Sequence, residues 1–322
     1  MLYRETLKLK DLTLRNRIVM PPMATNKAVD GAPGEALIEY YRERAKGTAL
    51  IVVEHAYVLP EGMAHAGQLS MADDGAIGAY RALTGAIHGE GCLAIAQLNH
   101  AGAAARDTGL PALAPSETLR RDGTTAAAMG PEDLARVRDG FVRAALRAKA
   151  AGYDGVEIHG AHGYLLSQFY SPLTNRRGDA YGPQSIENRT RLHREILRAV
   201  REAVGEDYPV AIRFGACDYA EGGSLPEEAA PAARAFEEAG ADLIDVSGGL
   251  NGFTVPGRTE PGWFRELSAP IRAAVSIPVL LTGGVTAPQE MERLLAEGAA
   301  DLIGVGRAML KDAAWSRRAL AD

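Results

Sequence analysis

Eight short apolar segments recur along this 322-residue chain, and a segment with helical spacing follows each of them. The segments are continuously apolar and not alternating, which is typical of parallel strands buried on both faces. They span residues 17–20, 49–54, 92–98, 155–159, 209–214, 243–247, 278–282 and 302–305. Strand and helix alternating eight times, with short connections, predict a single (β/α)8 TIM barrel domain over residues 1–322.

The junctions between elements support this prediction. Gly152, Gly240 and Gly298 each follow a helical segment, where glycine readily adopts a left-handed C-cap, and an aspartate then precedes the next strand. Ser224 and Thr286 fit the start of a capping box, with proline in the first helical turn. These signals predict where helices end and begin around the barrel.

Two further segments are expected at opposite ends of the barrel. Residues 7–9 and 12–14, split by a Lys-Asp pair, predict an N-terminal β-hairpin at the bottom of the barrel. Residues 99–131 form the longest irregular stretch and follow the third strand. Long loops are usually functional or disordered, so we expect this one to cover the C-terminal end of the barrel, where active sites form.

Composition excludes several classes of function. The chain holds 35 basic and 41 acidic residues, a net charge of −6, whereas a nucleic-acid partner requires a basic face. No apolar run approaches the roughly 20 residues of a membrane span, and the N-terminus lacks a signal-peptide core. We therefore expect a cytoplasmic protein without a membrane or nucleic-acid partner. The two cysteines cannot form a four-cysteine metal or iron–sulfur site, and no metal is expected.

A histidine–tyrosine segment directly follows the fourth predicted strand. His159, His162 and Tyr164 are spaced H-x-x-H-x-Y. Two imidazoles can hydrogen-bond one carbonyl oxygen while a phenol delivers a proton nearby. The alternative is a pair of packed histidines beside a half-buried tyrosine. The position at the C-terminal end of a barrel strand favours the chemical interpretation.

Glycines follow the last two predicted strands. Gly283 and Gly284 come after the seventh strand, and Gly306 and Arg307 after the eighth. Loops at these two positions commonly bind phosphate in barrels, through backbone N–H groups and a helix N-terminus. The alternative is that these glycines only form tight turns.

Two polar side chains are expected to point into the barrel. Gln97 and Arg213 lie near the ends of the third and fifth strands. A buried guanidinium without an acceptor is costly, so either a ligand with a polar ring edge or a salt bridge to Glu54 or Glu157 must satisfy it.

Taken together, these motifs resemble the old yellow enzyme family of FMN-dependent ene-reductases, from about residue 7 to the C-terminus. The matching segments look closest to bacterial members and to the catalytic barrels of 2,4-dienoyl-CoA and 2-enoate reductases. They are residues 14–23, 97–102, 159–164, 168–172, 175–177, 187–189 and 304–307.

The resemblance implies FMN across the barrel mouth, with NADH or NADPH as transient hydride donor. A small unsaturated carbonyl compound would be the second substrate, its oxygen held by His159 and His162 and its α-carbon protonated by Tyr164. The residues implied to bind FMN are Pro22, Met23, Ala24 and His55 beside the ring, Gln97 and Arg213 at its polar edge, and Gly283, Gly284, Gly306 and Arg307 at its phosphate.

This chain departs from the family pattern at several positions. Ala24 stands where many members have Thr or Cys, and His55 where a small residue is more common. The turn at residues 181–185 carries one extra residue. The dienoyl-CoA type continues into an iron–sulfur and a second nucleotide domain, whereas the sequence here ends soon after Arg307, so we expect electrons from a pyridine nucleotide or a separate partner.

Three other functions stay open at this point. The barrel can be a subunit of a larger redox complex, or FMN can serve amine or N-methyl oxidation. A flavin-free phosphate-binding lyase or isomerase is the third alternative. The oligomeric state is also open, with a homo-oligomer possible.

Overall fold

The computed structural model describes residues 1–321 and contains a closed barrel of eight parallel strands. The barrel closes because β3 pairs with both β16 and β6, and every pairing around it is parallel. The predicted (β/α)8 fold is confirmed. The barrel strands are β3 (Ile18–Met20), β6 (Leu50–Tyr57), β8 (Leu93–Asn99), β12 (Gly155–Gly160), β13 (Val210–Gly215), β14 (Leu243–Ser247), β15 (Val279–Thr282) and β16 (Leu302–Gly304).

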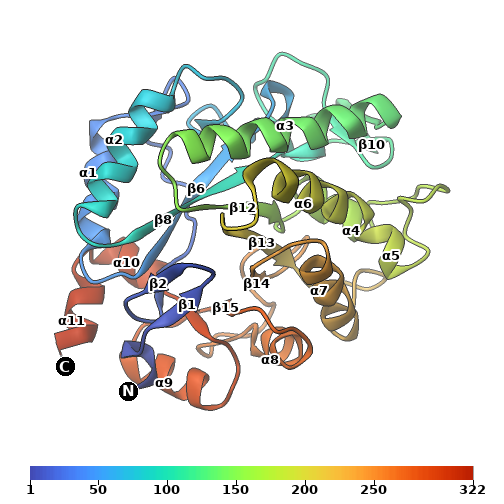
Figure 1. The fold of residues 1–322 in the computed structure, drawn as a ribbon. Helices are drawn as coiled ribbons and strands as arrows, with labels where there is room; N and C mark the ends of the chain where they lie inside the picture. The colour runs from blue at the N-terminus through green and yellow to red at the C-terminus, as the bar shows by residue number, and fades with distance from the viewer. Residues whose placement is uncertain (322) are drawn as a thin grey trace.

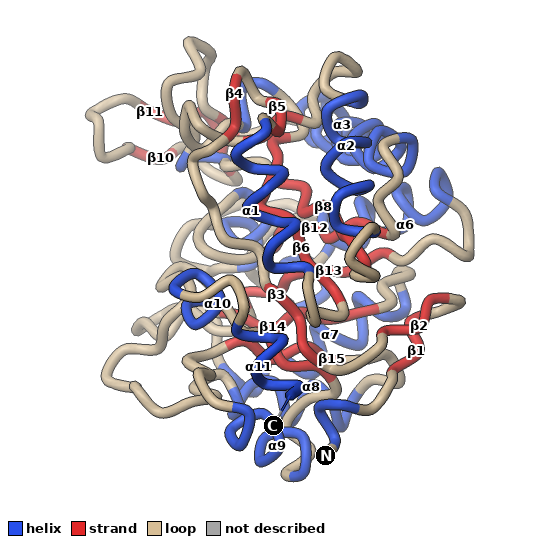
Figure 2. The backbone as a smooth tube through the Cα atoms, turned by 90° about the vertical axis from the view of Figure 1, so that its left-hand side faces the viewer, coloured by secondary structure: helices blue, strands red, loops and turns tan. Residues whose placement is uncertain are grey.

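Helices surround the strands (Figure 1). Their apolar faces pack on the barrel, as in α3, where every third or fourth residue from Leu134 to Ala148 is buried. The two ends of the described chain lie on the same side of the molecule in Figures 1 and 2. The helices are α1 (Glu35–Ala45), α2 (Ile77–His88), α3 (Pro131–Ala150), α4 (Leu165–Tyr170), α5 (Ile186–Arg189), α6 (Arg191–Val204), α7 (Ala229–Glu238), α8 (Arg265–Ala274), α9 (Pro288–Ala296), α10 (Arg307–Lys311) and α11 (Trp315–Ala321).

The predicted hairpin closes the lower end of the barrel. Strands β1 (Leu7–Leu9) and β2 (Leu12–Leu14) pair antiparallel, with Leu7 opposite Leu14. Leu9 and Leu14 are buried in one apolar cluster with barrel residues such as Val19. In Figure 2 this hairpin lies at the right, at the end opposite β10 and β11. It therefore covers the end of the barrel that faces away from the strands' carboxyl termini.

The three repeated junctions have the predicted glycine geometry and a second function in the fold. Gly152, Gly240 and Gly298 adopt φ of 83°, 100° and 69°, the left-handed region that glycine favours. The aspartate that follows each accepts a hydrogen bond from the first residues of the neighbouring strand. The pairs are Asp154 with Ala94 N (2.7 Å), Asp242 with Val210 N (2.9 Å) and Asp301 with Val279 N (3.0 Å). The repeat thus joins the lower ends of adjacent strands.

Two predicted helix starts were wrong by one residue. Glu228 accepts the backbone N–H of Leu225, and Glu290 accepts that of Ala287, so the cap position follows Ser224 and Thr286. In both places the first residue of the helix is set by the glutamate that accepts a backbone N–H, and the preceding serine or threonine hydroxyl does not set it.

The long loop after β8 was expected to be irregular throughout, but it contains three short strands. Strands β9 (Leu113–Ala114), β10 (Thr118–Leu119) and β11 (Thr125–Ala128) form a small sheet within it. The remaining short strands are β4 (Ala28–Val29), β5 (Ala32–Pro33) and β7 (Leu69–Ser70), and the 3-10 turns are Leu2–Arg4, Pro60–Gly62, Gly102–Ala104 and Pro226–Glu228. Among residues 1–321, no helix combines the length and apolar character that crossing a membrane requires.

Candidate active site

The histidine–tyrosine segment forms one cluster at the carboxyl end of β12. His159 lies in the strand, and the chain then turns through left-handed φ of 61° at His162 and 71° at Gly163. This turn brings the His162 ring centroid to 5.0 Å and the Tyr164 centroid to 5.2 Å from that of His159. The predicted grouping of the three side chains is therefore present in the fold, as an edge-to-face arrangement with His159 at its centre.

All three rings are held in their neutral form. Burial, and then the charge of Arg213, lowers the pKa of His162 well below its usual value. Burial lowers the pKa of His159 in the same way, with further contributions from His162 and Arg213. Burial raises the pKa of the Tyr164 phenol, while the charge of Arg106 opposes this rise. At neutral pH the cluster thus offers imidazole N–H groups and a protonated phenol.

Each histidine has at least one ring nitrogen without a hydrogen-bond partner in the described chain. His162 Nε2 lies 2.7 Å from Ser247 Oγ, at the end of β14, which leaves Nδ1 as its free position. His159 Nδ1 is buried and has no hydrogen-bond partner in the described chain. A buried polar atom without a partner is costly, so this nitrogen marks a place where a bound molecule would be stabilised.

His55 joins this cluster because of a bulge in β6. The second strand runs to Tyr57, beyond its expected end, and its register with β8 shifts between Val53 and Ala56. The bulge places the buried His55 ring 5.4 Å from Tyr164 and 6.0 Å from His159, centroid to centroid. Its Nδ1 lies 2.6 Å from Gln68 Nε2, and burial lowers its pKa to about 3. His55 therefore lines the site as a neutral side chain held in place by Gln68.

His100, the residue directly after β8, supports the neighbouring loop. Its ring packs directly against Gly62, where a Cβ would come within 2.6 Å of it. Its Nδ1 accepts the N–H of Gly102, and burial lowers its pKa to about 3. These contacts make it part of the support for the loop after β8.

A buried polar network lies in the barrel interior next to the cluster. Arg213 Nε is 3.2 Å from Asp245 Oδ2, and Gln97 donates to Glu157 Oε1 at 2.8 Å. The salt-bridge partner of Arg213 is therefore Asp245 and neither Glu54 nor Glu157, because the strand register places Asp245 directly beside it. The other oxygen of Glu157 has no partner in the described chain.

Glu54 instead anchors the segment that follows β3. Its carboxylate accepts hydrogen bonds from Thr25 N (3.0 Å), Thr25 Oγ1 (3.1 Å) and the Tyr41 hydroxyl (3.3 Å). These bonds fix the end of the segment holding Pro22, Met23 and Ala24. The first two are half-buried and Ala24 is exposed.

The two glycine turns follow the neighbouring strands β15 and β16, and an unexpected tryptophan lies over the first of them. A Cβ on Gly306 would come 3.2 Å from Met23 Sδ, whereas one on Gly284 would come 2.5 Å from the Trp263 ring. The Arg307 guanidinium stacks on that ring, 4.9 Å from a ring centroid, and is otherwise exposed.

These residues fit a bound FMN at both of its ends. The Arg213 guanidinium and the Gln97 amide lie together in the interior, where they can meet a polar ring edge. The backbone N–H groups of Gly283, Gly284 and Gly306 make no hydrogen bond within residues 1–321 and can meet a phosphate. The ring end is more completely defined, since Trp263 covers part of the phosphate end. Within the described residues, no group of three or more His, Cys, Asp or Glu side chains could hold a metal ion.

Sequence reasoning missed three residues of this site. Asp245 had a readable signal, because it is the one charged residue of an apolar strand. Trp263 and Phe253 lie in the loop after β14, where no motif distinguished them. Phe253 is 64% exposed, and its ring centroid lies 6.2 Å from that of His162.

Comparison with known proteins identifies the family. A sequence profile described as the NADH:flavin oxidoreductase / NADH oxidase family matches residues 5–322. The chain belongs to this family. Its members are FMN-linked NAD(P)H oxidoreductases, so the predicted enzyme class, the FMN cofactor and the nicotinamide donor are confirmed at this level.

Individual members of the family are similar over nearly the whole chain. An NADH oxidase of Thermoanaerobacter brockii is 42% identical over 97% of this chain and 50% of its own length. A metal reductase of Desulforamulus reducens is 40% identical over 96% of this chain and 47% of its own. The chain thus spans about half the length of these two relatives. An NADPH dehydrogenase of Halalkalibacterium halodurans is 39% identical over 97% of this chain and 92% of its own.

Solved structures agree with this assignment. An old yellow enzyme homologue from Zymomonas mobilis superposes with a TM-score of 0.87 at 27% identity, covering 99% of this chain and 92% of the other. A 2-naphthoyl-CoA reductase in complex with 2-naphthoyl-CoA gives a TM-score of 0.93 at 26% identity, over 99% of this chain and 52% of the other. The resemblance to the old yellow enzyme family is confirmed.

Proposed function

We propose that this protein reduces the C=C bond of α,β-unsaturated carbonyl compounds with hydride from NADH or NADPH. The observation that carries the proposal is the cluster of His159, His162 and Tyr164, in which neutral donors of two kinds share one end of the barrel. When bound, FMN would supply the redox chemistry by which hydride moves from the nicotinamide to the β-carbon of the substrate. The protein's own residues would polarise the carbonyl and supply the proton.

His159 and His162 would bind the carbonyl oxygen through their free nitrogens. As hydride adds to the β-carbon, negative charge develops on this oxygen, and two preorganised donors stabilise it. For His162 to donate from Nδ1, the Ser247 hydroxyl must donate to Nε2 and so select the tautomer. Ser247 is in this proposal a positioning residue.

Tyr164 would protonate the α-carbon. Burial keeps its phenol neutral, which an acid must be before it can give its proton. With one hydride at the β-carbon and one proton at the α-carbon, the double bond is reduced by two electrons. The products are the saturated carbonyl compound and NAD(P)⁺.

Residues of the barrel interior and the glycine turns would hold the cofactor. Arg213, supported by Asp245, and Gln97, supported by Glu157, would meet the polar edge of the FMN ring. Gly283, Gly284, Gly306 and Arg307 would meet the phosphate. Pro22, Met23, Ala24 and His55 would border the ring.

Substitution of Tyr164 by Phe tests the assignment of the proton donor. We expect reoxidation of the reduced FMN protein by 2-cyclohexenone to slow by about 100-fold in Tyr164→Phe, since general acid catalysis contributes on the order of 10²–10⁴. Stopped-flow absorbance under anaerobic conditions measures this step apart from reduction by NADPH. An unchanged rate would show that another group supplies the proton.

The histidine pair requires a separate measurement. A protein with both His159→Ala and His162→Ala should retain FMN and lose its affinity for a phenol that occupies the carbonyl position. Absorbance titration of the bound flavin reports both properties. Purified wild-type protein that cannot hold flavin at all would overturn the whole proposal.

A further inference from the structure

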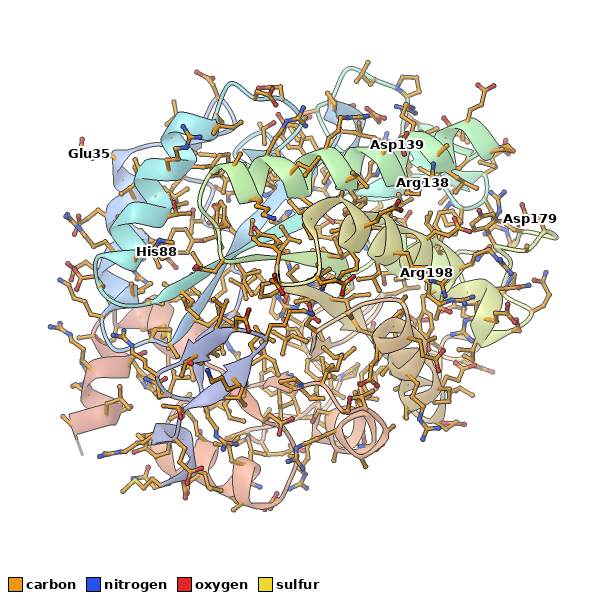
Figure 3. The ribbon with its side chains drawn as sticks, viewed as in Figure 1. Glu35, His88, Arg138, Asp139, Asp179 and Arg198 are labelled. Atoms are coloured by element: carbon orange, nitrogen blue, oxygen red, sulfur yellow. The ribbon has the colours of Figure 1, made fainter. Side chains whose placement is uncertain are left out.

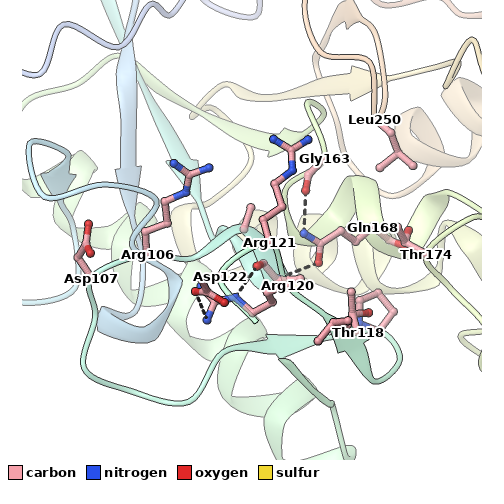
Figure 4. A pocket seen from close by; sticks show the side chains of 14 residues that line it. Arg106, Asp107, Thr118, Arg120, Arg121, Asp122, Gly163, Gln168, Thr174 and Leu250 are labelled. Carbon is pink, nitrogen blue, oxygen red and sulfur yellow. Dashed lines mark hydrogen bonds and ion pairs between the residues drawn. The ribbon is translucent and has the colours of Figure 1, made fainter. Parts of the chain in front are cut away.

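A cavity of about 670 Å³ borders the candidate site on the side of the loop after β8. This volume falls in the range of ordinary ligand pockets, roughly 300–1,000 Å³. Gly163, the residue before Tyr164, lies in its lining (Figure 4). Apolar side chains such as Leu119 and Leu250 also line it. The cavity can therefore accept the distal part of a molecule whose reactive end lies at Tyr164.

Three arginines and two aspartates line this cavity, which gives it a positive balance on a chain of net charge −6. The arginines are not equivalent. Arg120 is fully engaged, donating to Ala103 O at 3.0 Å and to Thr124 Oγ1 at 2.8 Å, and pairing with Asp122 at 3.4 Å. Its role is to join the loop to the turn between β10 and β11.

Arg106 and Arg121 have no such partners. Neither guanidinium group makes a hydrogen bond or salt bridge with any residue in the range 1–321. Figure 4 shows both side chains extending to the same side of the loop, with Arg121 directed toward Gly163. Two cations in the lining of one cavity, both without an acceptor in the described chain, make that cavity a favourable place for an anion.

The pocket is coupled to the reaction site through Arg106. Its positive charge lowers the pKa of Tyr164 against the larger raising effect of burial, so the two groups lie within electrostatic reach. The ring of Tyr164 also packs on the small cluster of Ala64, Ala101 and Ala105 at the start of the same loop. A ligand can thus extend from the Tyr164 hydroxyl along the loop to the two arginines.

We infer that Arg106 and Arg121 form a subsite for an anionic group, a phosphate or a carboxylate, on a ligand whose reacting end lies beside Tyr164. The inference rests on the proposed function for the position of the reacting end. The anion has two possible sources, the 2′-phosphate of NADPH or an acidic group on the unsaturated substrate.

Two matched ligand pairs separate these sources. The first pair is NADPH and NADH, whose affinities follow from saturation of anaerobic flavin bleaching. The second is a cyclohexenone carrying a carboxylate and 2-cyclohexenone itself, whose affinities follow from reoxidation of the reduced protein. In the double variant Arg106→Gln/Arg121→Gln, we expect the preference for the charged member of at least one pair to fall about tenfold or more. Added salt should weaken the same preference in the wild type.

Arg198→Gln is the matched control. Arg198 is likewise exposed and forms no ion pair within residues 1–321, but it lies on α6 (Figure 3), in the lining of a different cavity that also includes Lys10. This variant should show wild-type preferences for both pairs. Flavin content and thermal unfolding of all variants establish that they are folded.

The outcomes are distinct. A loss confined to the NADPH pair assigns the subsite to the donor, and a loss confined to the enone pair assigns it to the substrate. Unchanged preferences in both pairs overturn the inference. If wild-type reduced protein is not oxidised by either enone, the proposed function fails, while the nucleotide pair still reports on the arginines.

Discussion

At the residue scale, the most unusual feature is a pair of carboxyl groups that share one arginine inside the barrel. Glu157 and Asp245 are fully buried, and Arg213 is the cation between their strands. Burial, and then the charge of Asp245, raises the pKa of Glu157, while Arg213 and Gln97 oppose this rise. Burial likewise raises the pKa of Asp245 against the effect of Arg213.

This arrangement predicts a pH dependence of stability. A carboxyl group whose pKa is raised in the folded state stabilises the fold below its ordinary pKa of about 4.3, and this contribution is lost as the pH rises through the raised value. Glu157→Gln keeps an acceptor for Gln97 and cannot ionise. We expect the variant and the wild type to have similar unfolding free energies near pH 5, and the variant to be more stable by about 1 kcal/mol or more at pH 9.

Urea unfolding of both proteins at several pH values measures this difference. Glu202→Gln is the control, because Glu202 is an exposed carboxylate on α6 that forms no hydrogen bond or ion pair within residues 1–321. A difference between Glu157→Gln and wild type that does not change with pH would contradict the prediction.

At the element scale, two glycines within helices, one exposed and one buried, test whether side-chain packing outweighs the low helix propensity of glycine. Gly85 is exposed in α2, and a Cβ there would meet nothing within 4 Å. Gly140 is buried in α3, and a Cβ there would lie 2.9 Å from Leu59 Cγ. Glycine costs a helix about 1 kcal/mol relative to alanine at either position.

We expect Gly85→Ala to stabilise the protein by about 0.5–1 kcal/mol. Gly140→Ala should instead destabilise it by about 1–3 kcal/mol, because the added methyl group overpacks the contact with Leu59. Thermal unfolding followed by circular dichroism measures both. Equal shifts of the same sign in the two variants would show that this contact relaxes freely.

Some of these elements could be predicted from sequence patterns and others could not. The order of strands and helices, and the positive φ of Gly152, Gly240 and Gly298, follow from periodicity and from glycine at helix ends. The bulge that turns His55 into the site cannot be predicted in this way, because a single extra residue in β6 leaves the hydrophobic pattern of the strand unchanged. The N-cap positions at Leu225 and Ala287 were also not predicted, because the sequence pattern allows either of two adjacent residues to be the N-cap.

At the scale of the whole molecule, the hairpin at the lower end and the active site at the upper end belong to one barrel. Leu14 is fully buried beneath the strands, on the side away from His159. We expect Leu14→Ala to lower the unfolding free energy by about 2–5 kcal/mol, through lost contacts and the cavity left behind. Because the strands form one closed sheet, flavin release and loss of circular dichroism should shift together.

Leu146→Ala provides the comparison. Leu146 is 43% exposed on α3, and its truncation should change stability by no more than about 0.5 kcal/mol. Flavin release that occurs well before the circular dichroism transition in Leu14→Ala would show that the two ends of the barrel unfold separately.

The sequence by itself determined the barrel, the family and the presence of His159, His162 and Tyr164 at the end of the fourth strand. These features depend on spacing between residues that are close in the chain, and spacing is directly readable. Only the tertiary structure decided that Asp245 pairs with Arg213, that Trp263 covers Gly284, and that Arg106 and Arg121 share a cavity. Such pairings join residues far apart in the chain, and they depend on strand register and loop path, which local patterns do not encode.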